Sequence, residues 1–263
     1  REWLLHIRKA ARGNGSLPGI IPTTGWGFDW GNGPAWDQVL VTLTDLCYRF
    51  TGDPSVIAEN AGALLNYCRY LAARRDENGL LALGLGDWCA PHGNPKAPLL
   101  FTDSVISRDI AKKTAFLLRV IRQDEGAAVC ETLADSLYEA IRAHLIDQKT
   151  MTAAGCCQTS QAMALFYGIF TPEETPAAYE KLLQMIHEAD DHIDCGVLGA
   201  RVLFRVLTEH GDADLALRIL TQKTAPSYGE WVARGETALC EDFAPYSEHV
   251  NSLNHHFFGD ISA

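Results

Sequence analysis

Residues 105–146 have the sequence VISRDIAKKTAFLLRVIRQDEGAAVCETLADSLYEAIRAHLI, and this stretch decides the fold. Apolar residues recur every three or four positions on both sides of the short segment Gln123-Asp124-Glu125. That spacing is typical of amphipathic helices, which bury one stripe of side chains. The stretch therefore predicts two helices, at residues 105–122 and 126–146, joined by a tight turn.

The same periodicity extends along the chain, and no stretch shows the convincing alternation of a half-buried strand. Pro34, Pro54 and Pro172 stand at or just before predicted helix starts, where a fixed φ and a missing N–H cost little. The other predicted helices are residues 2–11, 34–50, 54–74, 158–170, 173–188, 197–209, 212–221 and 250–261.

The links between these helices alternate between short and long. Antiparallel hairpins joined in that order place every short turn at one end of the domain and every long loop at the other. This is the connectivity of an α/α toroid, whereas an α-solenoid repeats a consensus that this sequence lacks. We therefore predict an all-α toroid. The long links are residues 12–33, 75–104, 147–157, 189–196 and 222–249.

The composition is that of an ordinary globular chain, with 47% hydrophobic and 21% charged residues, which excludes disorder and collagen. The net charge of −11 disfavours nucleic acid and anionic membranes as partners. The eight cysteines form no C-x-x-C motif, so we expect buried free thiols. Free thiols favour a cytoplasmic location, with a periplasmic or secreted one as the alternative.

The long loops carry side chains that suit a carbohydrate. Trp26, Trp30 and Trp36 lie in or beside the first long loop, and Asp87 and Trp88 lie in the second. Indole rings pack on the C–H faces of sugars, and carboxylates accept hydrogen bonds from hydroxyl groups. The alternative is that these residues only plug the mouth of the barrel. Further candidates in or beside the loops are His92, Asp103, Trp231, Glu236, Glu241, Asp242 and His255.

Signs of other chemistries are absent from the sequence. There is no G-x-S-x-G motif and no P-loop. His187 and His192 are five positions apart rather than four, so they do not share a helix face as a zinc motif requires. We therefore predict no metal and no cofactor.

Five motifs, taken in order along the chain, resemble those of the bacterial α-L-rhamnosidases, glycoside hydrolase family seventy-eight. The resemblance covers essentially the whole chain and implies an (α/α)6 toroid. A complete toroid has twelve helices, against about ten predicted here, so we expect residues 1–263 to be one catalytic-domain fragment, cut at both ends and incomplete at the N-terminus. The motifs are GWGF at 25–28 with GPAWD at 33–37, GLGDWC at 84–89, QTSQA at 158–162, GETALCEDF at 235–243 and SLNHHFFG at 252–259.

The resemblance implies an enzyme that releases terminal α-L-rhamnose from glycosides or polysaccharides by an inverting acid/base mechanism. It implies that Glu241 is the general base, that Trp36 and Trp88 line the rhamnose subsite, and that His255 bonds a sugar hydroxyl. The remaining candidates for substrate binding are Asp87, Asn254, Trp26 and Asp37. Asp87 and Asn254 have an equally good alternative role, in which they orient Trp88 and cap the local backbone instead of contacting the sugar.

The sequence departs from the family pattern near Glu241. Ala238, Cys240 and Phe243 stand where the family commonly has Thr, an aromatic residue and often Trp. The resemblance also assigns the general acid to a segment before Arg1, so we expect residues 1–263 to need the rest of the parent chain for activity. The alternatives are another inverting (α/α)6 glycosidase with a different sugar, or a non-catalytic carbohydrate-binding remnant.

Overall fold

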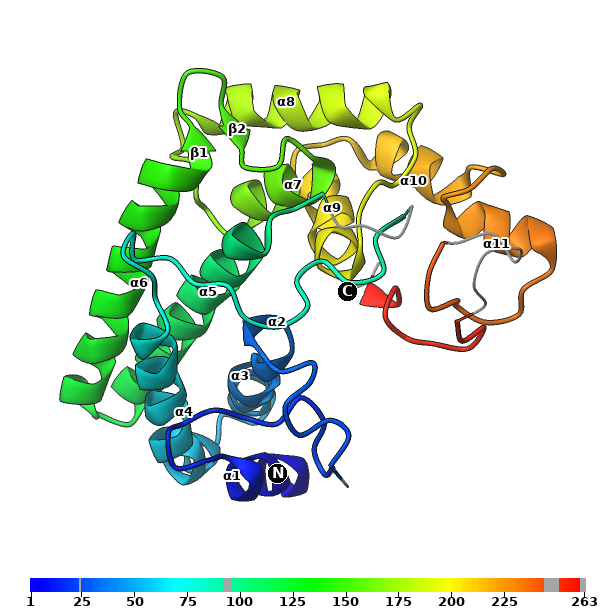
Figure 1. The fold of residues 1–263 in the computed structure, drawn as a ribbon. Coiled ribbons are helices and arrows are strands. Elements are labelled where there is room, and N and C mark those ends of the chain that lie inside the picture. Colours follow the sequence, from blue (N-terminus) through cyan, green and yellow to red (C-terminus); the bar gives the residue numbers. More distant parts are fainter. Residues whose placement is uncertain (24, 92–95, 244–250, 261–263) are drawn as a thin grey trace. The chain divides into compact units, whose positions relative to one another are not determined.

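The computed structural model describes residues 1–263 except 24, 92–95, 244–250 and 261–263, so the candidate His92 lies outside the described residues. The chain divides into two compact units (Figure 1). The first comprises residues 1–85 and 99–144, and the second comprises residues 86–98 and 145–263. Apart from one short hairpin, the regular elements of the described residues are helices, which confirms the all-α prediction.

The first unit is built from six helices. Helix α4 shows why they form, because Val56, Ile57, Leu64 and Leu71 recur at helical spacing and are all buried. Helices α3 and α5 pack against α4, and α2 packs against α5. The helices are α1 (Glu2–Ala10), α2 (Pro34–Asp37), α3 (Val39–Thr51), α4 (Ser55–Ala73), α5 (Leu99–Val120) and α6 (Asp124–Leu145), the last residue of which belongs to the second unit.

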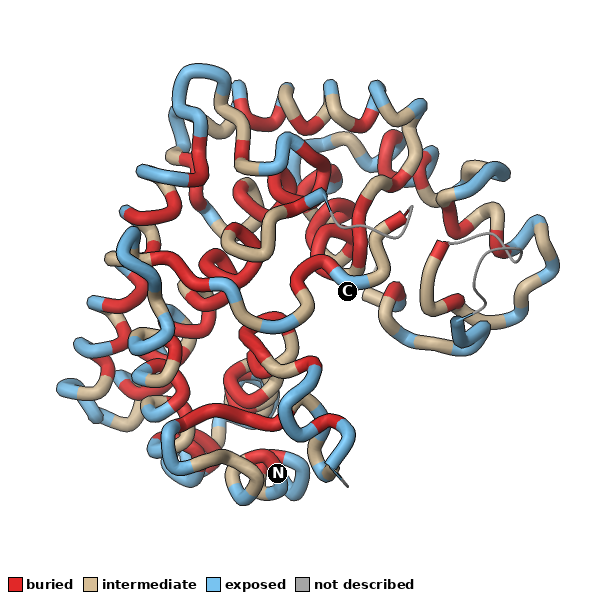
Figure 2. Tube along the Cα trace, in the orientation of Figure 1, coloured by how far each residue is buried: buried red, intermediate tan, exposed pale blue. Residues whose placement is uncertain are grey.

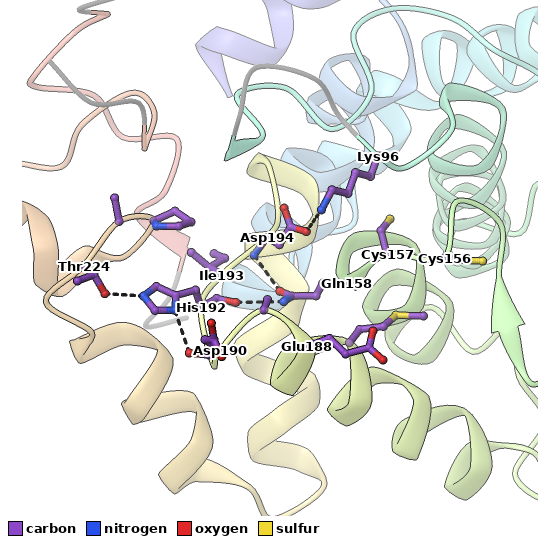
Figure 3. A pocket seen from close by; sticks show the side chains of 14 residues that line it. Lys96, Cys156, Cys157, Gln158, Glu188, Asp190, His192, Ile193, Asp194 and Thr224 are labelled. Atoms are coloured by element: carbon purple, nitrogen blue, oxygen red, sulfur yellow. Dashed lines mark hydrogen bonds and ion pairs between the residues drawn. The ribbon is translucent and has the colours of Figure 1, made fainter. Parts of the chain in front are cut away.

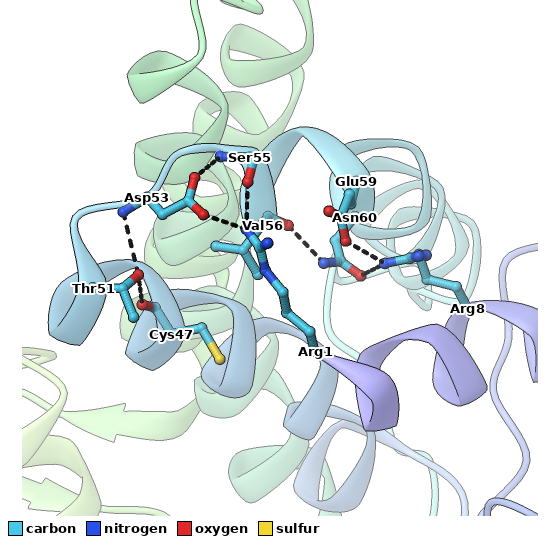
Figure 4. A network of polar contacts seen from close by, with 9 residues as sticks. All are labelled: Arg1, Arg8, Cys47, Thr51, Asp53, Ser55, Val56, Glu59 and Asn60. Carbon is cyan, nitrogen blue, oxygen red and sulfur yellow. Dashed lines mark hydrogen bonds and ion pairs between the residues drawn. The ribbon is translucent and has the colours of Figure 1, made fainter.

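The short turn between α3 and α4 is closed by side chains (Figure 4). The Asp53 carboxylate accepts a hydrogen bond from the Ser55 amide at 2.9 Å and pairs with the Arg1 guanidinium at 2.5 Å. The hydrogen bonds from Ser55 lower the pKa of Asp53, since they favour its charged form. Farther along, Arg8 donates to Asn60 at 2.8 Å. These contacts fasten α1 to the start of α4.

The second unit is arranged around α7, which packs against both α8 and α9. Figure 2 shows the buried backbone at its centre. Gln161 of α7 ties this centre together, because its amide nitrogen donates to the carbonyls of Met151 and Ala178 and its oxygen accepts from the Ala153 amide. The elements are β1 (Ile146–Asp147), β2 (Thr152–Ala153), α7 (Gln158–Phe166), α8 (Thr175–Glu188), α9 (Val197–Glu209), α10 (Ala213–Thr221) and α11 (Tyr228–Arg234).

A cluster of aromatic side chains anchors the C-terminal segment to α11. Trp231 stacks on Phe243 with ring centroids 4.5 Å apart, and Phe258 lies 4.7 Å from Phe243. The Tyr228 hydroxyl donates to the Phe258 carbonyl at 3.1 Å. The cluster therefore fixes Phe243 and Phe258, which both follow Glu241 in the sequence, against α11.

The helix predicted at residues 250–261 is wrong, because residues 251–260 form loop and turns, and residues 250 and 261 lie outside the described part of the chain. The Ser252 hydroxyl bonds both the amide and the carbonyl of Asn254, which competes with helical hydrogen bonding.

Several boundaries also differ from the prediction. The helix expected at 34–50 is divided at Gln38 into α2 and α3, and α5 begins at Leu99 rather than at 105. Helix α11 and the β1–β2 hairpin were not predicted from the sequence.

Within each unit the long loops lie against one another, as the order of hairpins predicts. In the first unit, the backbone at Asn32-Gly33 touches that at Leu83-Gly84. In the second, the Val197 amide donates to the Trp88 carbonyl at 2.9 Å. All eight cysteines lie among the described residues and are free thiols, and five of them are buried, as expected. None of the described helices is both long and apolar enough to cross a membrane.

We predict that Gly199→Ala destabilises the protein by about 1–3 kcal/mol, because an added methyl would overpack the contact between α7 and α9. A Cβ at Gly199 would lie 2.8 Å from the Cys195 side chain and closer still to the Thr159 hydroxyl. The matched control is Gly62→Ala in α4, where nothing lies within 4 Å. Urea unfolding of the full-length protein should show a gain of about 0.5–1 kcal/mol for the control. Equal effects of the two substitutions would contradict the packing argument.

Candidate functional site

In the first unit, Trp36 is held by a tight turn at the start of α2. The carbonyl of Gly33 accepts hydrogen bonds from the amides of Trp36 at 3.0 Å and Asp37 at 2.8 Å. In return, the Gly33 amide donates to the Asp37 carboxylate at 3.1 Å, and the Tyr67 hydroxyl donates to the same oxygen at 2.8 Å. Trp36 is half-buried, whereas Asp37 is buried.

Two buried carboxyl groups lie in this unit. Burial raises the pKa of Asp37 to about 7, although hydrogen bonds from Tyr67 and Gly33 oppose the rise. Burial also raises the pKa of Asp103 to about 8, and the charge of Asp37 adds to that shift. Asp103 accepts a hydrogen bond from the Leu83 amide. Both side chains therefore bind backbone amides of the loops next to Trp36.

Trp26 lies on the exposed part of the first long loop, with 71% of its surface accessible. Its ring lies 5.1 Å from that of Trp30, which is 45% exposed. Beside them, the Arg12 guanidinium lies 4.0 Å from the centre of the Phe28 ring and pairs with Asp29 at 2.9 Å. Exposed indole rings of this kind can pack on the C–H faces of a sugar.

In the second unit, Asp87 is a buried cap of α9. One carboxylate oxygen accepts from the Thr159 hydroxyl at 2.6 Å and the Gly196 amide at 2.8 Å, and the other accepts from the amides of Leu198 and Gly199 at 2.9 and 3.1 Å. Burial raises the pKa of Asp87, and these hydrogen bonds oppose the rise. Because protein donors occupy both oxygens, the contacts favour a supporting role over sugar contact.

Trp88 directly follows this buried carboxylate and is 37% exposed. Its carbonyl accepts from the Val197 amide, so the backbone on both sides of the indole is tied to the start of α9. The next residue is Cys89. Burial raises the pKa of its thiol to about 12, and the negative charge of Glu241 contributes to the rise. The segment that carries Trp88 therefore lies near Glu241 in this unit.

Glu241 is paired with Ser252 in the C-terminal region. Its amide donates to the Ser252 carbonyl at 2.8 Å, and the Ser252 amide donates to the Glu241 carboxylate at 2.9 Å. The His255 amide donates to the Leu239 carbonyl at 2.8 Å. The structure thus brings Glu241 and His255, predicted from separate motifs, into one paired segment, with Asn254 exposed beside them.

Sequence reasoning missed the residues that hold these groups in place. The clearest are Ser252, which binds Glu241 through its backbone, and Tyr67, which binds Asp37 across the first unit. Ser252 lies in the SLNHHFFG motif, but its partner Glu241 is eleven positions away in a loop. Helical or strand periodicity does not indicate a contact of this kind. Tyr67 has the spacing of an ordinary buried helix residue.

A separate pocket of about 490 Å³ opens in the second unit beside the start of α7 (Figure 3). On its wall Lys96 pairs with Asp194, and the His192 ring bonds the Thr224 hydroxyl at 2.8 Å. The Gln158 side chain accepts from the Asp194 amide and donates to the His192 carbonyl. These polar groups bond one another, and the described lining includes none of the residues predicted to bind sugar.

The described residues contain no group of three or more His, Cys, Asp or Glu side chains placed to hold a metal ion. The two histidines of the sequence motif have other partners. His187 pairs with Asp191 at 2.6 Å, and His192 bonds Thr224.

The family model for the bacterial alpha-L-rhamnosidase 6 hairpin glycosidase domain matches residues 1–263, and thus both units. Among curated proteins, an alpha-L-rhamnosidase of Formosa agariphila is 27% identical across 99% of this chain and 29% of its own length. One of Streptomyces avermitilis is 28% identical across 99% of this chain and 25% of its own length. The chain therefore spans less than a third of these relatives.

Solved structures give the same result. The structure of alpha-L-rhamnosidase from Dictyoglumus thermophilum matches with a TM-score of 0.90 at 25% identity, covering 99% of this chain and 30% of that one. The Streptomyces avermitilis alpha-L-rhamnosidase complexed with L-rhamnose matches with a TM-score of 0.88 at 25% identity. This match covers 99% of this chain and 25% of that one. These matches confirm the six-hairpin toroid fold class, and the chain belongs to the bacterial α-L-rhamnosidase six-hairpin glycosidase domain family.

Proposed function

We propose that this chain is part of an α-L-rhamnosidase that releases terminal α-L-rhamnose with inversion, and that Glu241 is its general base. The observation that carries the proposal is the pairing of the Glu241 and His255 segments through Ser252 and Leu239. A base must be fixed relative to the sugar so that it can remove a proton from an attacking water. The two hydrogen bonds at Ser252 supply that fixation.

The charges around Glu241 suit a carboxylate that acts on water. One oxygen accepts a hydrogen bond from the Ser252 amide. The nearby Arg234 pairs with Glu230 at 3.5 Å and with Glu236 at 3.4 Å. Among the described residues Glu241 makes no ion pair.

The proposed sugar contacts are Trp36 in the first unit and Trp88, His255 and Asn254 in the second. Both indoles are partly accessible, and each follows or precedes a buried carboxyl that fixes the backbone beside it. An indole face suits the apolar 6-methyl side of rhamnose. Trp26, on the exposed loop of the first unit, is a further proposed sugar contact. Asp37 and Asp87 would hold the backbone beside Trp36 and Trp88 rather than touch the sugar.

The second candidate is an inverting glycosidase of the same fold with a different sugar. The departures at Cys240 and Phe243 favour it, because Phe243 packs on Trp231 and Cys240 is buried next to Glu241. A panel of aryl glycosides separates the two candidates, since only a rhamnosidase prefers the α-L-rhamnoside. The cytoplasmic location and the absence of nucleic-acid and membrane partners stay predictions.

Glu241→Gln in the full-length protein should lower kcat on an aryl α-L-rhamnoside by roughly 10²–10⁴, with little change in KM, because the amide cannot accept the proton of water. Glu230→Gln in α11 is the matched control, since Glu230 pairs with Arg234 and should leave kcat unchanged. Proton NMR of the wild-type reaction should show the β anomer of rhamnose first. Wild-type turnover by Glu241→Gln would remove Glu241 from the mechanism.

Trp36→Ala and Trp88→Ala should each weaken rhamnose binding by about 1–3 kcal/mol, because stacked apolar area is lost. Calorimetric titration with L-rhamnose measures this loss, and thermal unfolding should change much less. Trp231→Phe supplies the contrast, because Trp231 is 3% exposed in the aromatic cluster and should lower Tm without weakening the sugar affinity of folded protein. If both indole variants lose Tm but keep rhamnose affinity, the two residues are core residues and not a subsite.

A further inference from the structure

We propose that Asp103 and Asp37 act as a pair of positioning residues for Trp36, clamping the turn before this indole against residues 83–84. The inference rests on the proposed function in one respect, namely that Trp36 lines the rhamnose subsite. Neither carboxyl needs to touch the sugar. Each would act through the backbone that it holds.

The clamp begins at Gly33, the residue that caps α2. Its carbonyl receives the amides of Trp36 and Asp37, and its own amide donates to the Asp37 carboxyl at 3.1 Å. The Tyr67 hydroxyl, from α4, reaches the same carboxyl oxygen at 2.8 Å. Asp37 therefore ties the turn that bears Trp36 to the interior of the first unit.

The second half of the clamp is Asp103 in α5. Its carboxyl receives the Leu83 amide, and the neighbouring Ser104 hydroxyl accepts from the Leu81 amide at 3.1 Å. Residues 81–83 are thereby fixed along α5.

Two glycines join the halves. A Cβ at Gly33 would lie 2.8 Å from the Leu83 carbonyl carbon, and one at Gly84 would lie 3.1 Å from the Asn32 carbonyl carbon. Both glycines have positive φ, at 126° and 88°. Backbone meets backbone there, so a displacement of Leu83 displaces Gly33 and with it the α2 turn.

The clamp needs protonated carboxyls. Burial raises the pKa of Asp37 to about 7 and that of Asp103 to about 8, and the second oxygen of Asp103 has no hydrogen-bond partner within the described residues. A buried oxygen without a donor tolerates the neutral acid far better than the carboxylate. The other groups that face the pair are Arg12 from the first long loop and Tyr67 from α4, which oppose the rise at Asp37, and Thr102 of α5, whose hydrogen bond opposes the rise at Asp103.

The sign of the pH effect follows from these raised values. The folded protein binds more protons than the unfolded chain between the ordinary aspartate pKa, near 4, and the folded values near 7 and 8. The stabilisation is fully present below about pH 4 and is lost as the pH rises through about 8. Above that pH, two buried charges would lie on either side of the Gly33–Leu83 contact, and the cost of burying them, which exceeds the gain from their hydrogen bonds, would loosen the turn.

The experiment compares KM and kcat of full-length wild type, Asp103→Asn and Asp103→Ala on an aryl α-L-rhamnoside from pH 5 to pH 9. Wild-type KM should rise about two- to tenfold between pH 7 and pH 9, the effect of about one hydrogen bond, while kcat follows the acid and base. Asp103→Asn keeps an oxygen for the Leu83 amide and cannot ionise, so its KM should stay flat. Asp103→Ala should show the raised KM at every pH.

Asp45→Asn is the matched control, because Asp45 is a buried aspartate of the same unit that pairs with Arg49 at 2.8 Å. This control should keep the wild-type rise in KM. The same rise in Asp103→Asn as in wild type, or wild-type KM in Asp103→Ala, would overturn the proposal.

Two further measurements do not depend on rhamnosidase activity. The fall of Tm from pH 5 to pH 9 should be smaller in Asp103→Asn than in wild type and unchanged in Asp45→Asn, and an equal fall in all three proteins would refute the clamp. If Asp103→Asn does not fold, infrared titration of the wild-type protein should show a carboxylic acid band that is lost near pH 8. Absence of this band at pH 6 would also refute the clamp. Activity on a different sugar would reject the rhamnosidase proposal while these outcomes still decide the clamp.

Discussion

The Asp87 carboxylate at the start of α9 is the interaction on which the second unit depends. It satisfies three backbone amides that the helix itself cannot, and it joins them to α7 through Thr159. A negative group at a helix N-terminus is also favoured by the helix dipole. Because Trp88 is the next residue, one buried carboxyl group determines both where α9 begins and where the indole lies.

The helices of this protein could be predicted where burial follows a helical period. Helix α9 has the predicted bounds, because Leu198, Val202, Leu203 and Val206 bury one face along its whole length. The segment at 251–260 has similar apolar spacing, yet Ser252 bonds Asn254 locally and Phe258 enters the aromatic cluster instead. Spacing alone does not distinguish an apolar helix face from apolar residues that a loop inserts one at a time.

The candidate site could be predicted only in part, for a related reason. Motif order identified Glu241 and His255 as candidates, and the structure places their segments together. Whether Asp87 contacts a ligand or supports a neighbour depends on donors from Gly196 and Leu198, more than a hundred positions along the chain. The raised pKa values of Asp37 and Asp103 likewise arise from burial by several helices, which no local pattern encodes.

The contact between Gly33 and Gly84 also bears on how such enzymes can diversify. Each glycine leaves space for the carbonyl of the other segment, so neither position can gain a side chain unless the opposite loop withdraws. Within the first unit, residues 12–33 and 75–85 consequently have to change as a matched set. Grafting one of them from a relative would break the fit, whereas exchanging both together would preserve it while changing the loop surface around Trp26 and Trp36.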